Sequence, residues 1–217
     1  MNTSRITLCI PTLNRYDLLE ACLKSARNGS LKPEIFVIDN GGMLPRHLKN
    51  YVDELLTPTD NLGVAKSWNW FIDVAKHPMI ICNDDIMFGK GDIKSFYETY
   101  FSTKADLYYT NSLDSSLNMF SCFMPTPALI KKVGKFDEEF YPAYFEDNDY
   151  WYRMSLANCK TFPIRTELSH FGSATIKSYS DARMIQHHQE FVKNREYYIK
   201  KWGGEPGNES YRFPFNE

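Results

Sequence analysis

Apolar residues in the first half of the chain follow two alternating patterns. Short apolar runs at 6–10 (ITLCI), 34–42 (EIFVIDNGG) and 79–82 (MIIC) are typical of buried strands, and a weaker run lies at 53–57. Between them, 17–29 and 61–77 repeat apolar residues at helical spacing. We expect Asp17 to cap the start of the first helix and Gly29 to end it.

The second half is less regular. The pattern predicts helices near 91–102, over 126–134, over 146–159 and over 181–201, with strand-like runs at 105–109 and 119–125. Alternation of strands and helices predicts an α/β fold in which helices cover both faces of a mostly parallel, Rossmann-like sheet. Because no linker or repeat interrupts the chain, we expect one domain over 1–217, ending in a turn-rich tail at 204–217.

Composition narrows the choice of partner and compartment. A net charge of −2 gives no basic footprint for nucleic acid, and no run of about 18 apolar residues is long enough to span a bilayer. The N-terminus has no signal-peptide pattern, so we expect a cytoplasmic protein. The five cysteines lack CxxC spacing and lie in apolar stretches, which predicts buried, reduced thiols and no cysteine metal site.

Polar residues follow several of the predicted strands, where ligands collect in a parallel sheet. Pro11 and Thr12 follow the first, Asp39 the second, and Asp84 with Asp85 the strand at 79–82. Asp39 is either a turn-forming residue or a contact to a nucleotide. The adjacent carboxylates are either a solvated turn or, with a substrate diphosphate, a Mg²⁺ or Mn²⁺ site.

Two further segments carry candidate chemistry. Glu146, Asp147 and Asp149 either favour a helix N-terminus or include a general base flanked by aromatic rings that stack on a sugar. His170, in a stretch of small residues, is either structural or an extra metal ligand. We expect His187 and His188 to be surface or packing residues of the last helix.

Seven motifs in order resemble glycosyltransferase family 2 over about residues 5–203: ITLCIPTLNR, EIFVIDNGG, NLGVAKSWNW, CNDDI, GKFDEEFYPAYFEDNDYWYR, HFGSAT and YYIKKWGG. The resemblance implies the GT-A fold, with a nucleotide-sugar half at about 1–102 and an acceptor and catalytic half at about 103–203. It also implies a metal-dependent, inverting transfer of a hexose or deoxyhexose from a nucleoside-diphosphate sugar to a hydroxyl group of a glycan, protein or small molecule. UDP is the usual nucleotide of the family; dTDP and GDP stay open.

The resemblance also implies roles for individual residues. Asp147 matches the general base, and Asp85 and His170 match ligands of Mn²⁺ or Mg²⁺. Asn83 stands where the commoner metal motif has its first acid. Acceptor contacts fall on Tyr144, Glu146 and Asp149. The donor nucleotide is expected to contact Pro11, Thr12, Arg15, Asp39, Asn61, Gly63, Lys66 and Asp84.

Three other functions are compatible with parts of the pattern. A glycoside hydrolase also uses two carboxylates, but it needs neither a metal nor nucleotide-binding strand ends. A nucleotidyltransferase would share the sheet and the metal, but it commonly has a Gly-rich loop after the first strand, where this chain has PTLNR. A non-catalytic binding protein could keep all the same residues, and only turnover separates it from an enzyme.

Overall fold

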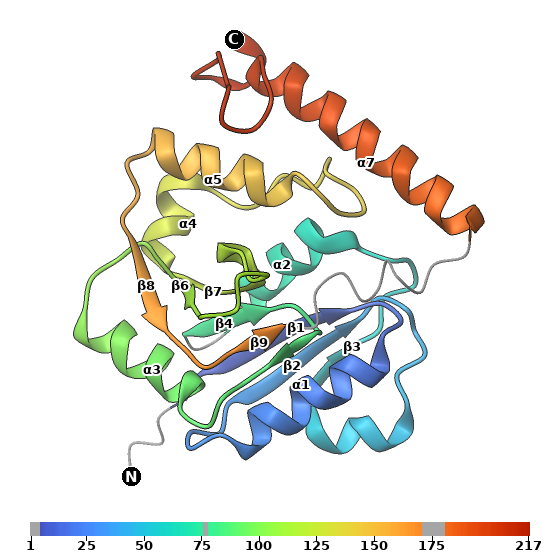
Figure 1. The fold of residues 1–217 in the computed structure, drawn as a ribbon, viewed down its shortest axis with the longest axis vertical. Coiled ribbons are helices and arrows are strands. Elements are labelled where there is room, and N and C mark those ends of the chain that lie inside the picture. The colour runs from blue at the N-terminus through green and yellow to red at the C-terminus, as the bar shows by residue number, and fades with distance from the viewer. Residues whose placement is uncertain (1–4, 76–77, 171–180) are drawn as a thin grey trace.

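The computed structural model describes residues 5–75, 78–170 and 181–217. A seven-stranded sheet in the order β3-β2-β1-β4-β7-β6-β8 forms its centre (Figure 1). The strands are β1 (Thr7–Thr12), β2 (Glu34–Asp39), β3 (Glu54–Leu56), β4 (Met79–Cys82), β6 (Leu107–Asn111), β7 (Cys122–Pro125) and β8 (Thr161–Arg165). Neighbours from β3 to β4 are parallel, β7 is antiparallel to both β4 and β6, and β6 is parallel to β8. The predicted α/β, mostly parallel sheet is confirmed.

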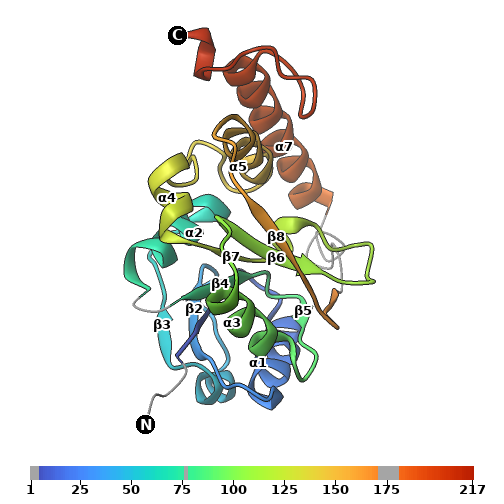
Figure 2. The ribbon, with the colours of Figure 1, turned by 90° about the vertical axis from the view of Figure 1, so that its left-hand side faces the viewer.

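Helices cover both faces of the sheet, as Figure 2 shows from the side. The helices α1 (Tyr16–Asn28) and α3 (Asp92–Ser102) pack on one face, and α2 (Gly63–Val74), α4 (Pro127–Val133) and α5 (Glu146–Leu156) pack on the other. Alternate residues of a strand point to opposite faces, so in β1 Leu8 and Ile10 join the first core and Cys9 joins the second. Both faces are therefore closed to water, which explains why the strands read as continuous apolar runs.

The last long helix, α7 (Asp181–Trp202), lies along the α5 side of the molecule (Figure 1). Its buried residues Tyr198 and Trp202 pack against Phe140 and Phe145, which come from the segment that leads into α5. Residues 203–217 fold back beside α7 and end in a short 3₁₀ helix, η3 (Pro214–Asn216). No helix among the described residues is both long and apolar enough to cross a membrane.

Some local predictions were wrong. Asp17 does not cap α1, because the helix begins one residue earlier and Asp17 sits in its first turn; Gly29 does end it. The antiparallel strand β7 in the middle of the sheet was not foreseen. Sequence patterns also missed the edge strand β8, because only Ile164 of its residues is buried and Pro163 interrupts the apolar alternation.

Four smaller elements complete the fold: η1 (Arg46–Tyr51), η2 (Met119–Ser121), β5 (Ile86–Met87) and β9 (Ser169–His170). The antiparallel pair β5-β9 sets Ile86 opposite His170, and it connects the end of β4 to the segment after β8. All five cysteines lie in the described part of the chain and have free thiols; four are buried and Cys159 is half-buried, as predicted.

Candidate active site

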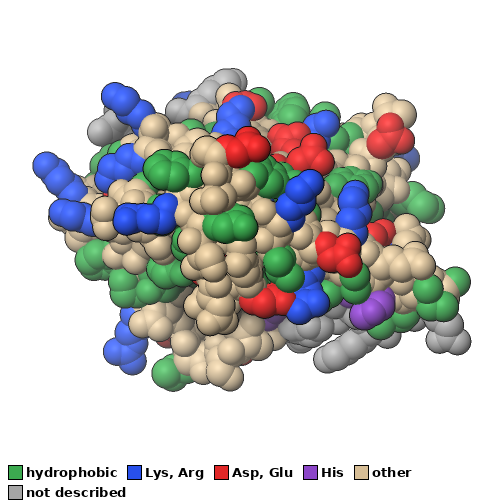
Figure 3. All heavy atoms as spheres, turned by 90° about the horizontal axis from the view of Figure 1, so that it is seen from above, with side chains coloured by type: hydrophobic (Ala, Val, Ile, Leu, Met, Phe, Trp, Pro, Cys, Tyr) green, Lys and Arg blue, Asp and Glu red, His purple; other side chains and the backbone are tan. Residues whose placement is uncertain are grey.

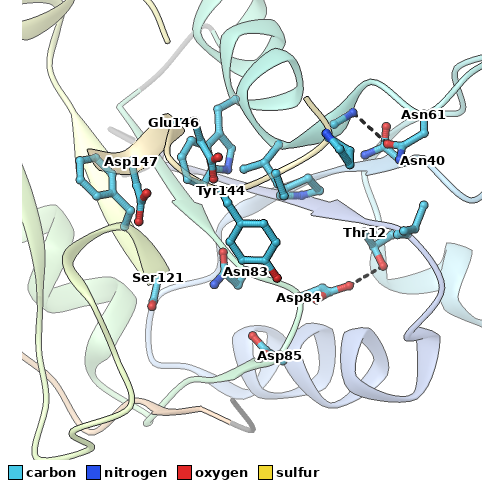
Figure 4. Close-up of a pocket in the computed structure, with 18 of the residues that line it drawn as sticks. Thr12, Asn40, Asn61, Asn83, Asp84, Asp85, Ser121, Tyr144, Glu146 and Asp147 are labelled. Atoms are coloured by element: carbon cyan, nitrogen blue, oxygen red, sulfur yellow. Dashed lines mark hydrogen bonds between the residues drawn. The ribbon is translucent and has the colours of Figure 1, made fainter. Parts of the chain in front are cut away.

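A cavity of about 480 Å³ lies at the carboxyl ends of β1 and β4 (Figure 4). This is the edge at which the loops of a parallel sheet leave room for a ligand. The cavity is also lined by the start of α2, the segment before α5 and the first turns of α7. It brings together ten of the residues predicted from the sequence: Pro11, Thr12, Asn61, Gly63, Asp84, Asp85, Tyr144, Glu146, Asp147 and His170.

Thr12 and Asp84 join the ends of two strands. The hydroxyl of Thr12 donates to Oδ2 of Asp84 across 2.7 Å, although the residues are 72 positions apart. Burial raises the pKa of Asp84 to about 7, against the opposing effect of this hydrogen bond. A carboxyl group with such a pKa carries only part of its charge near neutrality, which lessens its repulsion from neighbouring Asp85.

The start of α2 is built for close contact with the segment before α5. Gly63 has φ +74°, and a Cβ there would lie 2.8 Å from the carbonyl oxygen of Pro142, so only glycine fits. The next residue, Val64, donates its N–H to that same oxygen across 2.8 Å. Oδ1 of Asn61 accepts the N–H of Gly63, and Asn40 accepts that of Leu62. Asn61 and Gly63, which were expected to contact the donor, are thereby held close to the segment that leads to Asp147.

Asp85 and His170 meet in the lining of the cavity. Nε2 of His170 lies 3.0 Å from Oδ1 of Asp85, and this carboxylate raises the pKa of the imidazole. Asp114 accepts the backbone N–H of His170, while the other ring nitrogen lies 3.2 Å from the hydroxyl of Ser116. These contacts aim Nε2 at Asp85.

The same pair fits a divalent cation. Although His170 is close, Oδ1 of Asp85 is buried and has no aligned hydrogen-bond partner, which is the condition of a carboxylate oxygen reserved for a ligand. A carboxylate and an imidazole suit Mn²⁺ or Mg²⁺ when further oxygen ligands come from a substrate and water. Among the described residues no cluster of three or more acidic, His or Cys side chains forms a fuller metal site.

Glu146 and Asp147 begin α5 at the opposite side of the cavity. In the view of Figure 4, Tyr144 lies between these two carboxyl groups and Asp84. Glu146 is buried and its Oε2 has no hydrogen-bond partner; burial, and then the charge of Asp147, raise its pKa to about 8. Burial also raises the pKa of Asp147, which is half-buried, so its carboxylate is a stronger base than an exposed aspartate.

Four predicted site residues do not line this cavity. Arg15 pairs with Asp17 across 2.6 Å, and Lys66 is exposed on α2. Asp39 is buried, and its carboxylate accepts hydrogen bonds from the hydroxyl of Tyr16 and the backbone of Leu44. Of the two roles predicted for Asp39, this geometry favours the turn-forming one.

Asp149 is the fourth of these residues. It is fully buried and faces α7, where Nζ of Lys201 lies 2.6 Å away and the indole N–H of Trp202 donates to it across 2.9 Å. Arg153, one turn along α5, makes a further ion pair. The contacts with Lys201 and Trp202 hold α5 to α7, whereas the pair with Arg153 lies within α5, so the carboxylate of Asp149 is taken up by structural contacts.

The sequence reasoning missed one wall of the cavity. Arg183, His187 and Glu190 of α7 line it, and Tyr144 and His187 are joined by a 2.7 Å hydrogen bond between Oη and Nε2. His187 is thus part of the cavity and not only the surface or packing residue that was predicted. The spacing of these residues along one helical face was visible in the sequence, but nothing in it showed what that face contacts. The small residues of HFGSAT at 171–175 lie outside the described residues.

Comparison with known proteins decides the family. The profile described as "Glycosyl transferase family 2" matches residues 7–167, which include Thr12, Asp85 and Asp147. The chain belongs to glycosyl transferase family 2. The resemblance seen in its motifs is confirmed.

Relatives of this family 2 chain include a "Galactofuranosyl glycosyltransferase" of Leishmania donovani, 35% identical over 112 residues. That match covers 49% of this chain and 22% of the relative, so the chain spans about a fifth of that protein's length.

Solved structures show the same fold. A mannosyltransferase from Pyrobaculum calidifontis, in complex with GDP-Man and Mn²⁺, aligns with a TM-score of 0.63 at 15% identity, covering 94% of this chain and 66% of that one. TarS of S. aureus, in complex with UDP-GlcNAc, aligns with a TM-score of 0.60 at 12% identity, covering 94% and 74%. The fold is of the GT-A type, as expected from the motifs.

Proposed function

We propose that this glycosyltransferase moves a hexosyl or deoxyhexosyl group from a nucleoside-diphosphate sugar to an acceptor hydroxyl by a single displacement with inversion. The observation that carries the proposal is the placement of two different groups in one cavity: Asp147, a carboxylate with a raised pKa, and the Asp85–His170 pair. The first suits a general base, and the second suits the binding of a charged leaving group.

The transfer needs one base and no enzyme nucleophile. A lone pair of the acceptor oxygen attacks the anomeric carbon from the face opposite the diphosphate, forming a new C–O bond. The bond from that carbon to the diphosphate oxygen breaks, and its electron pair stays on the departing nucleoside diphosphate. The acceptor's hydroxyl proton passes to Asp147, an effect typically worth about 10²–10⁴ in rate.

Asp85 and His170 would hold a Mn²⁺ or Mg²⁺ ion. Such an ion supplies Lewis acidity that offsets the charge of the diphosphate. Thr12 and Asp84, joined by their hydrogen bond, would border the ribose, and Asn61 with Gly63 would lie against the ribose and diphosphate. Holding donor and acceptor in line within one cavity accounts for a further large part of the acceleration.

We infer a UDP-sugar as the first donor to test. The support is family habit together with the UDP-GlcNAc complex of TarS, a structure that shares the fold. The Pyrobaculum enzyme was crystallised with GDP-Man and Mn²⁺, so guanosine donors belong in the same test.

Calorimetric titration of the purified chain with UDP, dTDP and GDP, each with Mn²⁺ and with a chelator, tests the proposal. We expect one nucleotide to bind at least tenfold more tightly with Mn²⁺, and the corresponding nucleotide sugar to be turned over. If none of the three binds, the proposed donor site is wrong. Cleavage of glycosides without nucleotide or metal would instead indicate a hydrolase.

A further inference from the structure

One face of α7 forms a wall of the catalytic cavity that the family profile does not include. Arg183, His187 and Glu190 follow one another at spacings of four and three residues, which places them on the same side of the helix. The profile ends at residue 167, before α7 begins at residue 181. The family profile therefore assigns no role to this wall.

Arg183 and Glu190 form a fixed polar pair on the wall. Nη1 of Arg183 lies 2.9 and 3.0 Å from the two carboxylate oxygens, and Gln186 donates to Oε1 across 2.9 Å. The side chains are 28% and 19% exposed, so the pair is half-buried and still open to the cavity. Guanidinium offers only donors and carboxylate only acceptors, so the pair presents both kinds of group at one place.

Tyr144 connects this wall to the general base. Its hydroxyl is hydrogen-bonded to His187 and its ring meets the imidazole edge to face, with centroids 5.2 Å apart. Asp147 follows three residues after Tyr144 and lines the same cavity. A group bound between α7 and Tyr144 would therefore lie beside the base that takes the acceptor's proton.

The charge of the cavity decides which kind of group fits. On the acceptor side, its lining includes the carboxylates of Asp147 and Glu190 and one guanidinium, that of Arg183, which Glu190 already neutralises; Glu146 adds little charge, because burial raises its pKa to about 8. Acidic and basic side chains are interspersed on the right-hand part of the outer face drawn in Figure 3. A phosphate on the acceptor would meet net negative charge here, whereas sugar hydroxyls, which both donate and accept, match the wall.

We propose that Arg183, His187 and Glu190, with Tyr144, form an acceptor subsite for an uncharged sugar residue of a glycan or glycoside. This inference rests on the proposed function and adds the substrate class to it. Arg183 and Glu190 bind hydroxyl groups of the acceptor sugar, and Tyr144 provides a ring face for it. The neutral sugar is thereby held with one hydroxyl toward Asp147.

The test compares acceptor use with donor use in four proteins: the wild type, Glu190→Gln, His187→Gln and, as a matched control, Glu196→Gln. Glu196 is exposed on the same helix and does not line the cavity. The donor is the nucleotide sugar whose nucleotide binds in the calorimetric titration. The acceptor probes are methyl pyranosides and furanosides of glucose, galactose and mannose, with the three hexose 6-phosphates as charged counterparts.

We expect the wild type to transfer the sugar to at least one neutral glycoside, and to transfer it at least tenfold less to each of the three hexose 6-phosphates. Glu190→Gln and His187→Gln should raise the acceptor KM about tenfold or more, as expected for hydrogen bonds lost to charged or paired groups. They should leave nucleotide affinity within twofold of wild type. Glu196→Gln should behave as wild type throughout.

Three results would overturn the subsite: wild-type acceptor KM in both variants, preference for a phosphorylated acceptor, or donor hydrolysis with no transfer to any neutral glycoside. Absence of nucleotide binding in the wild type is a different result, because it contradicts the proposed function itself. Thermal unfolding of each variant separates loss of acceptor binding from loss of fold.

Discussion

Asn194, in the middle of α7, donates a hydrogen bond from Nδ2 to the carbonyl oxygen of Ala143 across 2.8 Å. A second, longer contact of 3.3 Å reaches the carbonyl oxygen of Tyr144. Tyr144 and Phe145 both have left-handed backbones, with φ of 80° and 71°, and such residues cost roughly 1–3 kcal/mol each. The fully buried Asn194 therefore stabilises a strained segment that leads directly into Glu146 and Asp147.

Replacing Asn194 with Leu should lower transfer at least tenfold while nucleotide affinity stays unchanged. The side chain keeps a similar volume but loses its donor, so the segment before Asp147 relaxes and the base moves. The free energy of unfolding should fall by about 1–3 kcal/mol. Tyr198→Phe is the control, since it removes a hydrogen bond from the same helix to Glu209 but keeps the ring that packs against Phe145. Equal transfer by the two variants would show that Asn194 is only structural.

Asp147→Asn should retain donor binding and lower transfer by about 10²–10⁴, because the amide cannot accept the hydroxyl proton. Initial rates and nucleotide titrations measure the two effects separately. Asp73→Asn, which alters an exposed ion pair with Lys135, is the control. In the wild type, kcat/KM should fall as the pH is lowered and Asp147 becomes protonated. Because the pKa of Asp147 is raised, the midpoint of this fall should lie above 3.8, the ordinary pKa of aspartate. A near wild-type rate in Asp147→Asn would exclude it as the base.

Asp85→Asn and His170→Gln should each remove most of the Mn²⁺-dependent part of nucleotide affinity. The physical reason is the loss of one of the two protein groups that fit the ion. Calorimetry with Mn²⁺ and with chelator measures the difference directly. Asp17→Asn changes a carboxylate in the first turn of α1 that does not line the cavity, so it should leave the metal-dependent part of nucleotide affinity unchanged. Unaltered metal dependence in both variants would remove the pair from the metal site.

Glu146→Gln should stabilise the fold increasingly as the pH rises. The pKa of Glu146 is about 8 in the folded protein against an ordinary value of 4.5, so the folded state keeps a proton that the unfolded state loses between these values. The free energy of unfolding of the wild type therefore falls by a few kcal/mol at most as the pH rises across this window, and it levels off above about pH 8. Chemical denaturation of both proteins at pH 5 and pH 8 measures the effect. If the free energies of unfolding of the two proteins differ by the same amount at pH 5 and at pH 8, the pKa of Glu146 is not raised.

Asp149→Ala should destabilise the protein by roughly 3–5 kcal/mol, because it removes a buried partner of Lys201. The ammonium group keeps Asp137 as a second partner, at 2.6 Å, which places the effect toward the lower end. Urea denaturation measures it, with Asp73→Ala as an exposed control. If Asp149→Ala is as stable as the wild type but has a raised acceptor KM, the acceptor role predicted from the motif is correct after all.

Patterns in the amino-acid sequence predict the alternation of strands and helices and the strand ends that carry Thr12, Asp84 and Asp85. Burial on both faces of a parallel sheet requires continuous apolar runs, and the carboxyl ends of such strands meet at one edge. The family motifs then pointed to Asp147 and His170, and both lie at that edge. Each of these signals is local, since it depends on neighbours within a few positions.

Contacts between distant parts of the folded chain set which polar side chains face the cavity. Asp39 and Asp149 belong to family motifs, yet their carboxylates are taken up by Tyr16 and by Lys201. His187 belongs to no recognised motif, yet it meets Tyr144, which lies 43 positions earlier. Such contacts depend on how α7 packs against α5, and that packing is set by buried aromatic residues far apart in the chain. Periodicity shows that a helix has a buried face, but it does not show what that face meets.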